Sequence, residues 1–443
     1  MSGRTKNIFL SVVVVALPTM LEQILSVLMQ YVDTAMVGRL GANATAAVST
    51  STTITWLIGS IPVAFGVGAM TQIAQAIGAG EHHKISQVAR TSLIFAVGVG
   101  VVLEAICLGV CPFVAGWMGA SAEVSPAATR YFFWISVPIV FKSVNIVLAS
   151  AIRATKDTKT PMYIGVGANI LNVVLDYIFI YSLGLGVDGA AYATCISAVF
   201  SGVMTLVVFL RHPEFKLEGS FFSVDGEIVN RMWRLAIPVL LINVASTSGY
   251  VVFAGLVSHM GTIMFAAHSI AVGAEELFYI GGYGFKSAAN TMVGISYGEQ
   301  NYEKYRAVCR SSIIATLGIM TLSGMLLFIF AEPLMSFFTN DPEVISIGTT
   351  VLKMVAFNEP FFGLYIISEG IYYGLGMTKY PFIIECGGMW LVRILSTFIG
   401  IHFFGMGLIY VWCCMIADNV LKAIFLTVPV KGLWRRSCVT KHN

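Results

Sequence analysis

Long apolar stretches with almost no charge run along the whole chain, and they restrict its fold more than any other feature. A helix that crosses a lipid bilayer needs roughly 20 mainly apolar residues. The sequence offers twelve such stretches, at about 9–37, 46–77, 89–111, 127–151, 161–182, 188–210, 234–257, 264–290, 311–330, 347–375, 381–401 and 406–428. Charged residues make up only 11% of the chain, whereas soluble domains average about a quarter. The sequence therefore predicts an all-α, polytopic membrane protein with 12 transmembrane helices.

Positive charge alternates between the loops and gives an orientation. Lysine and arginine gather at both ends of the chain and in every second loop: Arg4, Lys6, Lys84, Arg90, Arg153, Lys156, Lys159, Arg211, Lys216, Arg231, Arg234, Lys304, Arg306, Arg310, Lys379, Lys431, Arg435 and Arg436. Such loops face the cytoplasm. We therefore expect a multi-pass protein of the inner (plasma) membrane with both termini cytoplasmic and no removable signal peptide. The net charge of +3 reports this topology, and nucleic-acid binding is not expected.

The two halves of the chain repeat one another. A shift of 220 residues, the separation of Pro18 and Pro238, also aligns loop positions from the first span to the eleventh: Gly41 with Gly261, Gly78 with Gly298, Lys84 with Lys304, Lys159 with Lys379 and Pro161 with Pro381. A single offset held over so long a range indicates a duplication. We expect a six-helix lobe over 1–212, a cytoplasmic linker over 213–233, and a second six-helix lobe with a short tail over 234–443. Six is an even number of spans, so the lobes would be related by a pseudo-two-fold axis along the membrane normal, with a cavity between them.

Polar side chains inside the spans are costly and therefore mark functional candidates. Four of them share one face of the first span, at intervals of four, four and three residues: Glu22, Ser26, Gln30 and Asp33. The fifth span presents three more on one face, and the sixth contributes Thr194: Asn169, Asn172 and Asp176. Asp33, Asp176 and Thr194 all lie roughly 8–10 Å inside the outer membrane boundary. Two carboxylates with neutral oxygens at one depth could bind Na⁺, a proton or both, although a polar cluster that only joins helices is the alternative.

Several of these segments resemble the multidrug and toxic compound extrusion (MATE) family. The resemblance rests on ALP at 16–18, QYVDTAMVGRLG at 30–41 and RATKDTKTP at 153–161, followed by Asn172 and Asp176. It covers essentially the whole chain and looks most like the DinF-like branch. It implies an antiporter, working by alternating access, that exports organic cations or amphipathic compounds while H⁺ or Na⁺ enters.

The same resemblance assigns residues. It implies a cation-coupling site, also able to ligate Na⁺, at Asp33, Asn172, Asp176 and Thr194, with Pro18 as a bend in the first helix. We expect Gln30, Asn169 and Glu275 to face the substrate. The expected partners are a small-molecule substrate and membrane lipid. We expect a monomer that is not an enzyme and has no cofactor besides the coupling ion.

The second half departs from part of the family pattern. Some members carry a Glu in the seventh span and an Asp in the tenth, where this chain has Ser246 and Met377 or Thr378. Other charged residues lie in its spans instead, with roles that the sequence leaves open apart from Glu275: Glu275, Glu276, Lys286, Glu359, Glu369 and Arg393. Adjacent residues point about 100° apart on a helix, so only one of Glu275 and Glu276 can face a cavity squarely. An ion pair of Glu275 with Lys286 or Arg393 competes with a substrate-facing role.

Alternatives remain open at this stage. Lys142 in the fourth span could neutralise a nearby carboxylate or bind an anion. The eight cysteines lack metal-ligand spacing and are expected to be packing residues. A flippase for a lipid-linked precursor is the alternative function, and it would need a strongly cationic cavity. An intramembrane enzyme or receptor is a third reading, but the sequence has no catalytic constellation that supports it.

Overall fold

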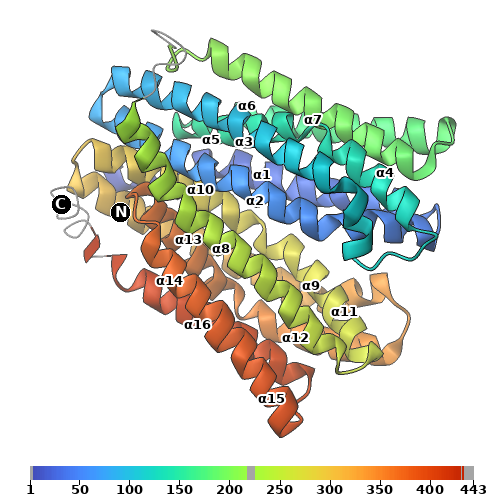
Figure 1. Ribbon diagram of the computed structural model, residues 1–443. Coiled ribbons are helices and arrows are strands. Elements are labelled where there is room, and N and C mark those ends of the chain that lie inside the picture. Colours follow the sequence, from blue (N-terminus) through green and yellow to red (C-terminus); the bar gives the residue numbers. More distant parts are fainter. Residues whose placement is uncertain (1–2, 217–224, 431, 434–443) are drawn as a thin grey trace. The chain divides into compact units, whose positions relative to one another are not determined.

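The computed structural model describes residues 3–216, 225–430, 432 and 433, and the regular elements in these ranges are all helical (Figure 1). Nine helical segments in this part of the chain are long and apolar enough to cross a membrane, or up to twelve if three bent helix pairs each count as one span. The predicted all-α membrane fold is therefore confirmed. In chain order the elements are α1 (Gly3–Gly38), α2 (Ala42–Ala79), α3 (His82–Trp117), α4 (Ser125–Ser136), α5 (Ile139–Ala154), α6 (Lys159–Asp176), η1 (Tyr177–Ser182), α7 (Gly186–Arg211), α8 (Gly226–Ser258), α9 (Thr262–Tyr279), α10 (Gly281–Gly298), α11 (Tyr302–Phe338), α12 (Pro342–Ala356), α13 (Glu359–Gly374), α14 (Lys379–Gly387), η2 (Gly388–Leu395), α15 (Ser396–Phe404) and α16 (Leu408–Thr427).

Three of the expected continuous spans are broken. The stretches 127–151, 264–290 and 347–375 each consist of two helices, α4 with α5, α9 with α10, and α12 with α13, bent by 46°, 42° and 51°. Pro138 lies at the first break and Pro360 at the third, where proline lacks the N–H that would continue the helical hydrogen bonds. The second break falls at Gly281 and Gly282, which are poor helix formers. Hydropathy alone could not locate these bends.

The duplication is visible in the backbone. Gly41 and Gly261 occupy equivalent positions and have φ angles of 108° and 107°. Lys156 and Gly376 form a second equivalent pair, with φ of 70° and 77°. The left-handed conformation is costly for any residue with a Cβ, so its retention at Lys156 indicates that the loop geometry is preserved between the repeats.

The compact units do not follow the expected lobe boundaries. One unit, here called the amino unit, comprises Ile24–Leu240; the other, the carboxyl unit, contains the chain up to Gln23 and from Leu241 onward. The divisions fall inside α1 and α8, a few residues after Pro18 and Pro238. The sequence repeat thus marks where the chain was duplicated. Packing, by contrast, places residues 3–23 of α1 in the carboxyl unit and residues 226–240 of α8 in the amino unit. Part of the expected linker over 213–233 lies outside the described residues, and its end forms the first turns of α8.

Close helix packing explains this assignment. In the carboxyl unit, Val12 and Ala16 of α1 share a buried core with Phe285 of α10. A Cβ on Gly284 would lie 2.6 Å from the backbone nitrogen of Met20, so glycine is what lets α10 approach α1. In the amino unit the ring of Trp233, in α8, lies edge-on 5.0 Å from that of Phe65 in α2.

Candidate functional sites

The amino unit places a half-buried carboxyl group, that of Asp33, beside a fully buried one, that of Asp176. Asp33 lies on α1, and Asp176 is the last residue of α6, with no exposed surface. The two side chains are close enough to interact directly. Neither oxygen of Asp176, nor Oδ1 of Asp33, has a hydrogen-bond partner among the described residues. Helices far apart in the sequence thus bring together two acidic groups within hydrogen-bonding reach of each other.

A π-helical turn follows Asp176 directly. The segment η1 begins at Tyr177, and the Leu183 N–H donates to the Ile178 carbonyl, five residues earlier, at 2.9 Å. Such turns interrupt regular helical bonding and occur frequently at functional sites. The carboxyl group therefore lies at a junction in the backbone rather than within a regular helix.

The remaining predicted residues of this site lie at different positions around the pair. Asn172 is one turn before Asp176, and its Nδ2 is buried without a hydrogen-bond partner in the described chain. Thr194 is half-buried on α7; no contact in the described structure joins its side chain to either carboxyl group. Tyr131 on α4 is buried, close enough to both aspartates for their charges to act on its hydroxyl. Sequence reasoning missed Tyr131, because one tyrosine in an apolar span carries no periodic signal.

The structure gives a separate result for each of two expected substrate residues, Asn169 and Gln30, and for the expected helix bend at Pro18. Asn169 Nδ2 donates to Ser26 Oγ at 3.1 Å and so joins α6 to α1. Gln30 is exposed, and its side chain makes no described contact with the carboxyl pair. Pro18 lies within α1, which remains one continuous helix from Gly3 to Gly38.

The chemistry of the aspartate pair follows from its burial. Two carboxylates placed together in a poorly solvated site cannot both keep a full negative charge, so one binds a proton or both share a cation. Within the described residues no group of three or more His, Cys, Asp or Glu is arranged to hold a metal ion. A monovalent cation would therefore need neutral oxygens, such as those of Asn172 and Thr194, in addition to the carboxylates.

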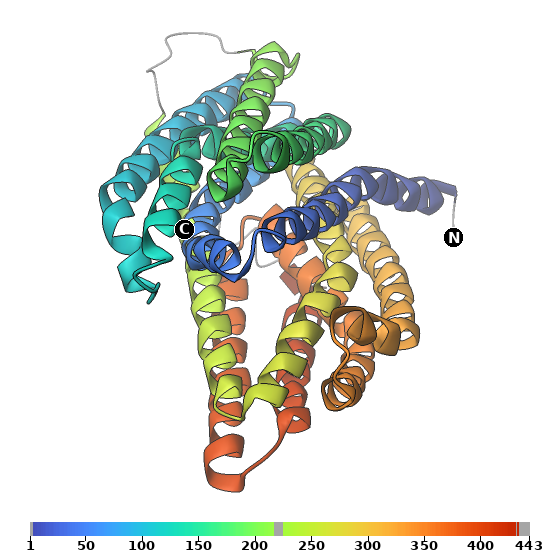
Figure 2. The same cartoon turned by 90° about the vertical axis from the view of Figure 1, so that its right-hand side faces the viewer.

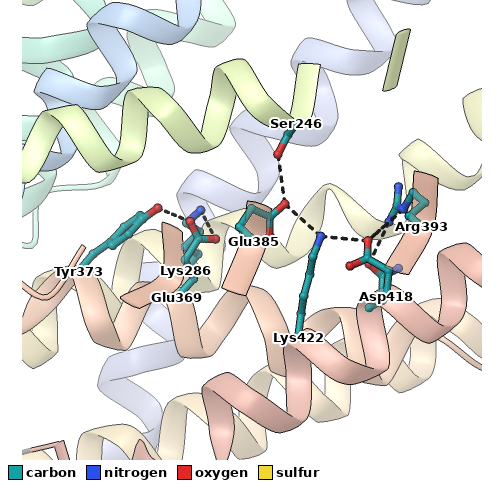
Figure 3. A network of polar contacts seen from close by, with 9 residues as sticks. Ser246, Lys286, Glu369, Tyr373, Glu385, Arg393, Asp418 and Lys422 are labelled. Carbon is teal, nitrogen blue, oxygen red and sulfur yellow. Dashed lines mark hydrogen bonds and ion pairs between the residues drawn. The ribbon is translucent and has the colours of Figure 1, made fainter. Parts of the chain in front are cut away.

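The carboxyl unit contains a chain of ion pairs (Figure 3). Lys422 of α16 lies 3.1 Å from Glu385 Oε1 and 3.0 Å from Asp418 Oδ2. Arg393, in η2, lies 2.9 Å from the same Asp418 oxygen. Ser246 of α8 donates to Glu385 Oε1 at 3.1 Å. Glu385, to which the sequence assigned no role, is thus buried within a chain that links four elements.

A second ion pair ties α10 to α13. Lys286 Nζ lies 2.7 Å from Glu369 Oε2, and the Tyr373 hydroxyl donates to the other oxygen of Glu369 (Figure 3). The ion pairs considered for Glu275 are therefore not formed, because Lys286 is paired with Glu369 and Arg393 with Asp418. Sequence reasoning missed Asp418 and Lys422, although opposite charges four residues apart in an apolar span were an available signal.

Two buried glutamates of the carboxyl unit, Glu275 and Glu359, have no ion pair among the described residues. Glu275 of α9 is 8% exposed, and Glu359 of α13 is 1% exposed with a buried, unpartnered Oε2. The two carboxyl groups act electrostatically on each other, and the Arg393 guanidinium also acts on Glu275. Glu276 is only half-buried, which agrees with the expectation that one of the adjacent glutamates faces inward. The carboxyl unit thus has its own buried acidic pair, and the cation that acts on it electrostatically is Arg393.

Comparisons with known proteins agree with this architecture. The MatE family model matches residues 18–178 and 238–399, one match in each repeat. The chain is 30% identical to a "Probable multidrug resistance protein NorM" of Thermotoga maritima, over 96% of this chain and 92% of the relative. It is 24% identical to a "Probable multidrug resistance protein YoeA" of Bacillus subtilis, over 96% and 94% of the two chains.

Solved structures give the same result for the fold. A crystal structure of MATE in complex with MaL6 matches with a TM-score of 0.92 at 23% identity, covering 98% of both chains. A structure described as the outward-facing conformation of a multidrug resistance MATE family transporter also has a TM-score of 0.92, at 23% identity over 97% of this chain and 96% of that chain. The helical arrangement is therefore shared along essentially the full length.

Proposed function

Because this chain belongs to the MATE family of membrane transporters, we propose that it exports organic cations or amphipathic compounds in exchange for H⁺ or Na⁺. The observation that carries the proposal is the close pair of Asp33 and Asp176, whose carboxyl groups can share a proton or a small cation. Relatives over nearly the full length are named multidrug resistance proteins, which supports a broad range of substrates.

The coupling step follows from the electrostatics of this pair. A proton or Na⁺ that neutralises the carboxyl groups removes the repulsion between α1 and α6, and its loss restores the repulsion. Binding of the ion therefore favours one arrangement of these helices, and its release favours the other. A cargo that binds only one of the two arrangements is then transported at the expense of the ion gradient.

The carboxyl unit supports a cationic substrate. Its ion-paired cations, Lys286, Arg393 and Lys422, already have carboxylate partners, whereas Glu275 and Glu359 have no ion pair in the described chain. An ammonium group on the substrate would neutralise this second acidic pair. The alternative, a flippase for lipid-linked pyrophosphates, gains no support from these three residues, because cations held in ion pairs are not free to bind a pyrophosphate.

Transport by the purified protein in liposomes tests the proposal. We expect efflux of a fluorescent cationic dye when an H⁺ or Na⁺ gradient is applied separately, and loss of this coupling in Asp33→Asn and Asp176→Asn. Glu275→Gln should raise the dye concentration needed for half-maximal efflux. It should leave the dependence of efflux on the ion gradient unchanged. Glu123→Gln, at an exposed position, serves as the control. Unchanged coupled efflux by Asp33→Asn would show that the assigned site is wrong.

Several finer assignments remain predictions. They are the DinF-like branch, the plasma-membrane location with cytoplasmic termini, the monomeric state, and the bending of α1 at Pro18 during transport. Proline weakens helical hydrogen bonding one turn before itself, which supports Pro18 as the point where α1 would bend.

A further inference from the structure

The ammonium group of Lys286 lies in a small cage between α10 and α13. Its Nζ is 2.7 Å from Glu369 Oε2, 5.1 Å from the centre of the Tyr373 ring and 5.5 Å from the centre of the Tyr283 ring (Figure 3 shows the first two partners). A carboxylate together with aromatic ring faces is the set of groups that proteins use to bind an ammonium ligand. The lysine therefore occupies an ammonium cage, made of Tyr283, Glu369 and Tyr373, with a side chain of the same protein.

Two helix turns that touch each other build this cage. Tyr283 and Lys286 lie one turn apart on α10, and Glu369 and Tyr373 lie one turn apart on α13. A Cβ on Gly370 would lie 2.5 Å from the Lys286 carbonyl oxygen, so a glycine lets the two backbones meet beside the ion pair. The Tyr373 hydroxyl donates to Glu369 Oε1. This bond holds the carboxylate in place independently of the lysine, which contacts the other oxygen.

Lys286 is the most exposed of the three cations drawn in Figure 3. Its side chain is 20% exposed, whereas the side chains of Arg393 and Lys422 are 4% and 2% exposed. The neighbouring Tyr283 is exposed as well. Lysine carries its charge on a flexible four-carbon stem. The Lys286 ammonium can therefore swing out of the cage on its exposed side, while the buried Glu369 stays in place.

A cage without the lysine needs another cation. Glu369 is 3% exposed, and a buried carboxylate that has lost its ion-pair partner is strongly destabilising. An incoming ammonium that takes the place of Lys286 Nζ restores the ion pair and the contacts with the two rings. The exchange of one ammonium for another keeps the charge of the cage constant, so it is the exchange that this site favours.

We propose that the ammonium cage binds the protonated amino group of a substrate, and that Lys286 competes with the substrate for this place. The proposal rests on the proposed export of organic cations, adds a second acidic group to the pair of Glu275 and Glu359, and narrows the chemistry of the substrate. A primary, secondary or tertiary ammonium keeps an N–H that donates to Glu369, as Lys286 does at 2.7 Å.

A quaternary ammonium lacks this donor. It presents only carbon atoms to the carboxylate, and these stay about 3.3–3.6 Å from an oxygen. The cage therefore selects protonated amines over quaternary ammonium ions. Lys286 lowers the affinity for both, because the fraction of molecules with an empty cage is small.

Binding to the purified full-length protein in mixed micelles tests this selectivity without relying on transport. The two ligands are benzyldimethylamine, which is protonated near neutral pH, and benzyltrimethylammonium, which has a methyl group in place of the N–H proton. The rise of the thermal unfolding temperature with ligand concentration gives their affinities. We expect the protonated amine to bind about tenfold more tightly or better, as for a charge-assisted hydrogen bond. Glu369→Gln should remove this difference.

Lysine variants test the competition. Lys286→Met empties the cage and should bind the protonated amine about tenfold more tightly than the wild type does, or better. The control is Lys353→Met, at a half-buried lysine that lies 5.8 Å from the centre of the Phe328 ring, and it should bind as the wild type does. In the wild type, the protonated amine should also speed acetylation of Lys286 by an N-hydroxysuccinimide ester, measured by mass spectrometry, because the displaced amino group becomes accessible.

Equal affinity of the wild type for the two ligands would overturn the proposal. Affinity for the protonated amine that is no higher in Lys286→Met than in the wild type would overturn it as well. Should Lys286→Met not fold, acetylation of Lys286 in the wild type decides, and a rate that saturating amine leaves unchanged counts against the proposal. Coupled efflux enters none of these measurements, so the cage and the ion-coupling site of Asp33 and Asp176 can fail separately.

Discussion

Arg393 and Asp418 are joined by two contacts to a single oxygen: Arg393 Nε and Nη2 lie 3.0 and 2.9 Å from Asp418 Oδ2. Both residues are buried. Arg393 belongs to the π-helical segment η2 and Asp418 to α16, which runs beside it (Figure 2). A Cβ at Gly388 would overlap Asp418, so a glycine at the start of η2 gives the carboxylate its space. The pair therefore fixes the packing of the last two spans.

Removal of Asp418 should destabilise the protein strongly. Asp418→Ala leaves Arg393 without its ion pair and Lys422 with Glu385 alone, and breaking a buried ion pair from one side costs about 3–5 kcal/mol. Equilibrium unfolding in mixed micelles measures this loss. Glu332→Ala, at an exposed position on α11, should stay within about 0.5 kcal/mol of the wild type. A similarly small effect for Asp418→Ala would contradict the structural role given to this network.

Asp176→Asn should stabilise the protein, which is the opposite of the effect expected for Asp418→Ala. Its buried carboxyl group lies beside that of Asp33, so Asp176→Asn removes the repulsion between two acidic groups while keeping the shape. We expect a gain of about 1–3 kcal/mol in unfolding free energy, together with loss of ion coupling. Asp188→Asn is the control, because Asp188 pairs with Arg130 at an exposed site and such pairs contribute about 0–1 kcal/mol. Destabilisation by Asp176→Asn would mean that the carboxylate is held by partners after all.

The contact between α10 and α1 should not tolerate a side chain at Gly284. Its Cβ would lie 2.6 Å from Met20 N and 2.9 Å from the Ala16 carbonyl oxygen, and these are backbone atoms that cannot rotate away. Gly284→Ala should therefore lower the thermal unfolding temperature. At Gly318 of α11 a Cβ meets nothing within 4 Å, so Gly318→Ala should stabilise by up to about 1 kcal/mol through helix propensity. Equal effects at the two sites would contradict the close approach.

His212 should make the amino unit sensitive to acid. Burial lowers the pKa of His212 below its ordinary value of about 6.5, although Asp157 and Glu214 oppose the shift. The neutral ring accepts the Glu214 N–H at Nδ1, at 3.3 Å, and contacts Thr155 Oγ1 through Nε2, at 3.3 Å. Protonation ends the first of these bonds.

The native state thus favours the neutral ring. The stability from this preference is fully present above about pH 6.5 and is lost as the pH falls through that value toward the lower native pKa. We expect the thermal unfolding temperature to fall between about pH 7.5 and pH 5.5, and to fall less in His212→Gln. An identical pH dependence in both proteins would exclude His212 as the cause.

The sequence alone determined the spans, the repeat and the first acidic pair. Twelve apolar stretches and a constant offset were sufficient for the first two, because a bilayer admits few structures other than apolar helices. Asp33 and Asp176 could be paired because helical periodicity and depth in the membrane both restrict where a side chain lies. The breaks within three spans could not be located, since a bend leaves the hydropathy of a segment unchanged.

Only the tertiary structure decided which charges pair in the carboxyl unit. Depth and periodicity allow Lys286 or Arg393 to pair with any of several glutamates, and the choice depends on contacts between helices that are distant in the sequence. Helix packing pairs Glu369 with Lys286 and Asp418 with Arg393, and it leaves Glu275 and Glu359 without an ion pair in the described chain. The physical reason is that ion-pair energy falls steeply with distance and is offset by desolvation, so shifts of a few ångströms between helices determine which charge has an ion-pair partner and which has none.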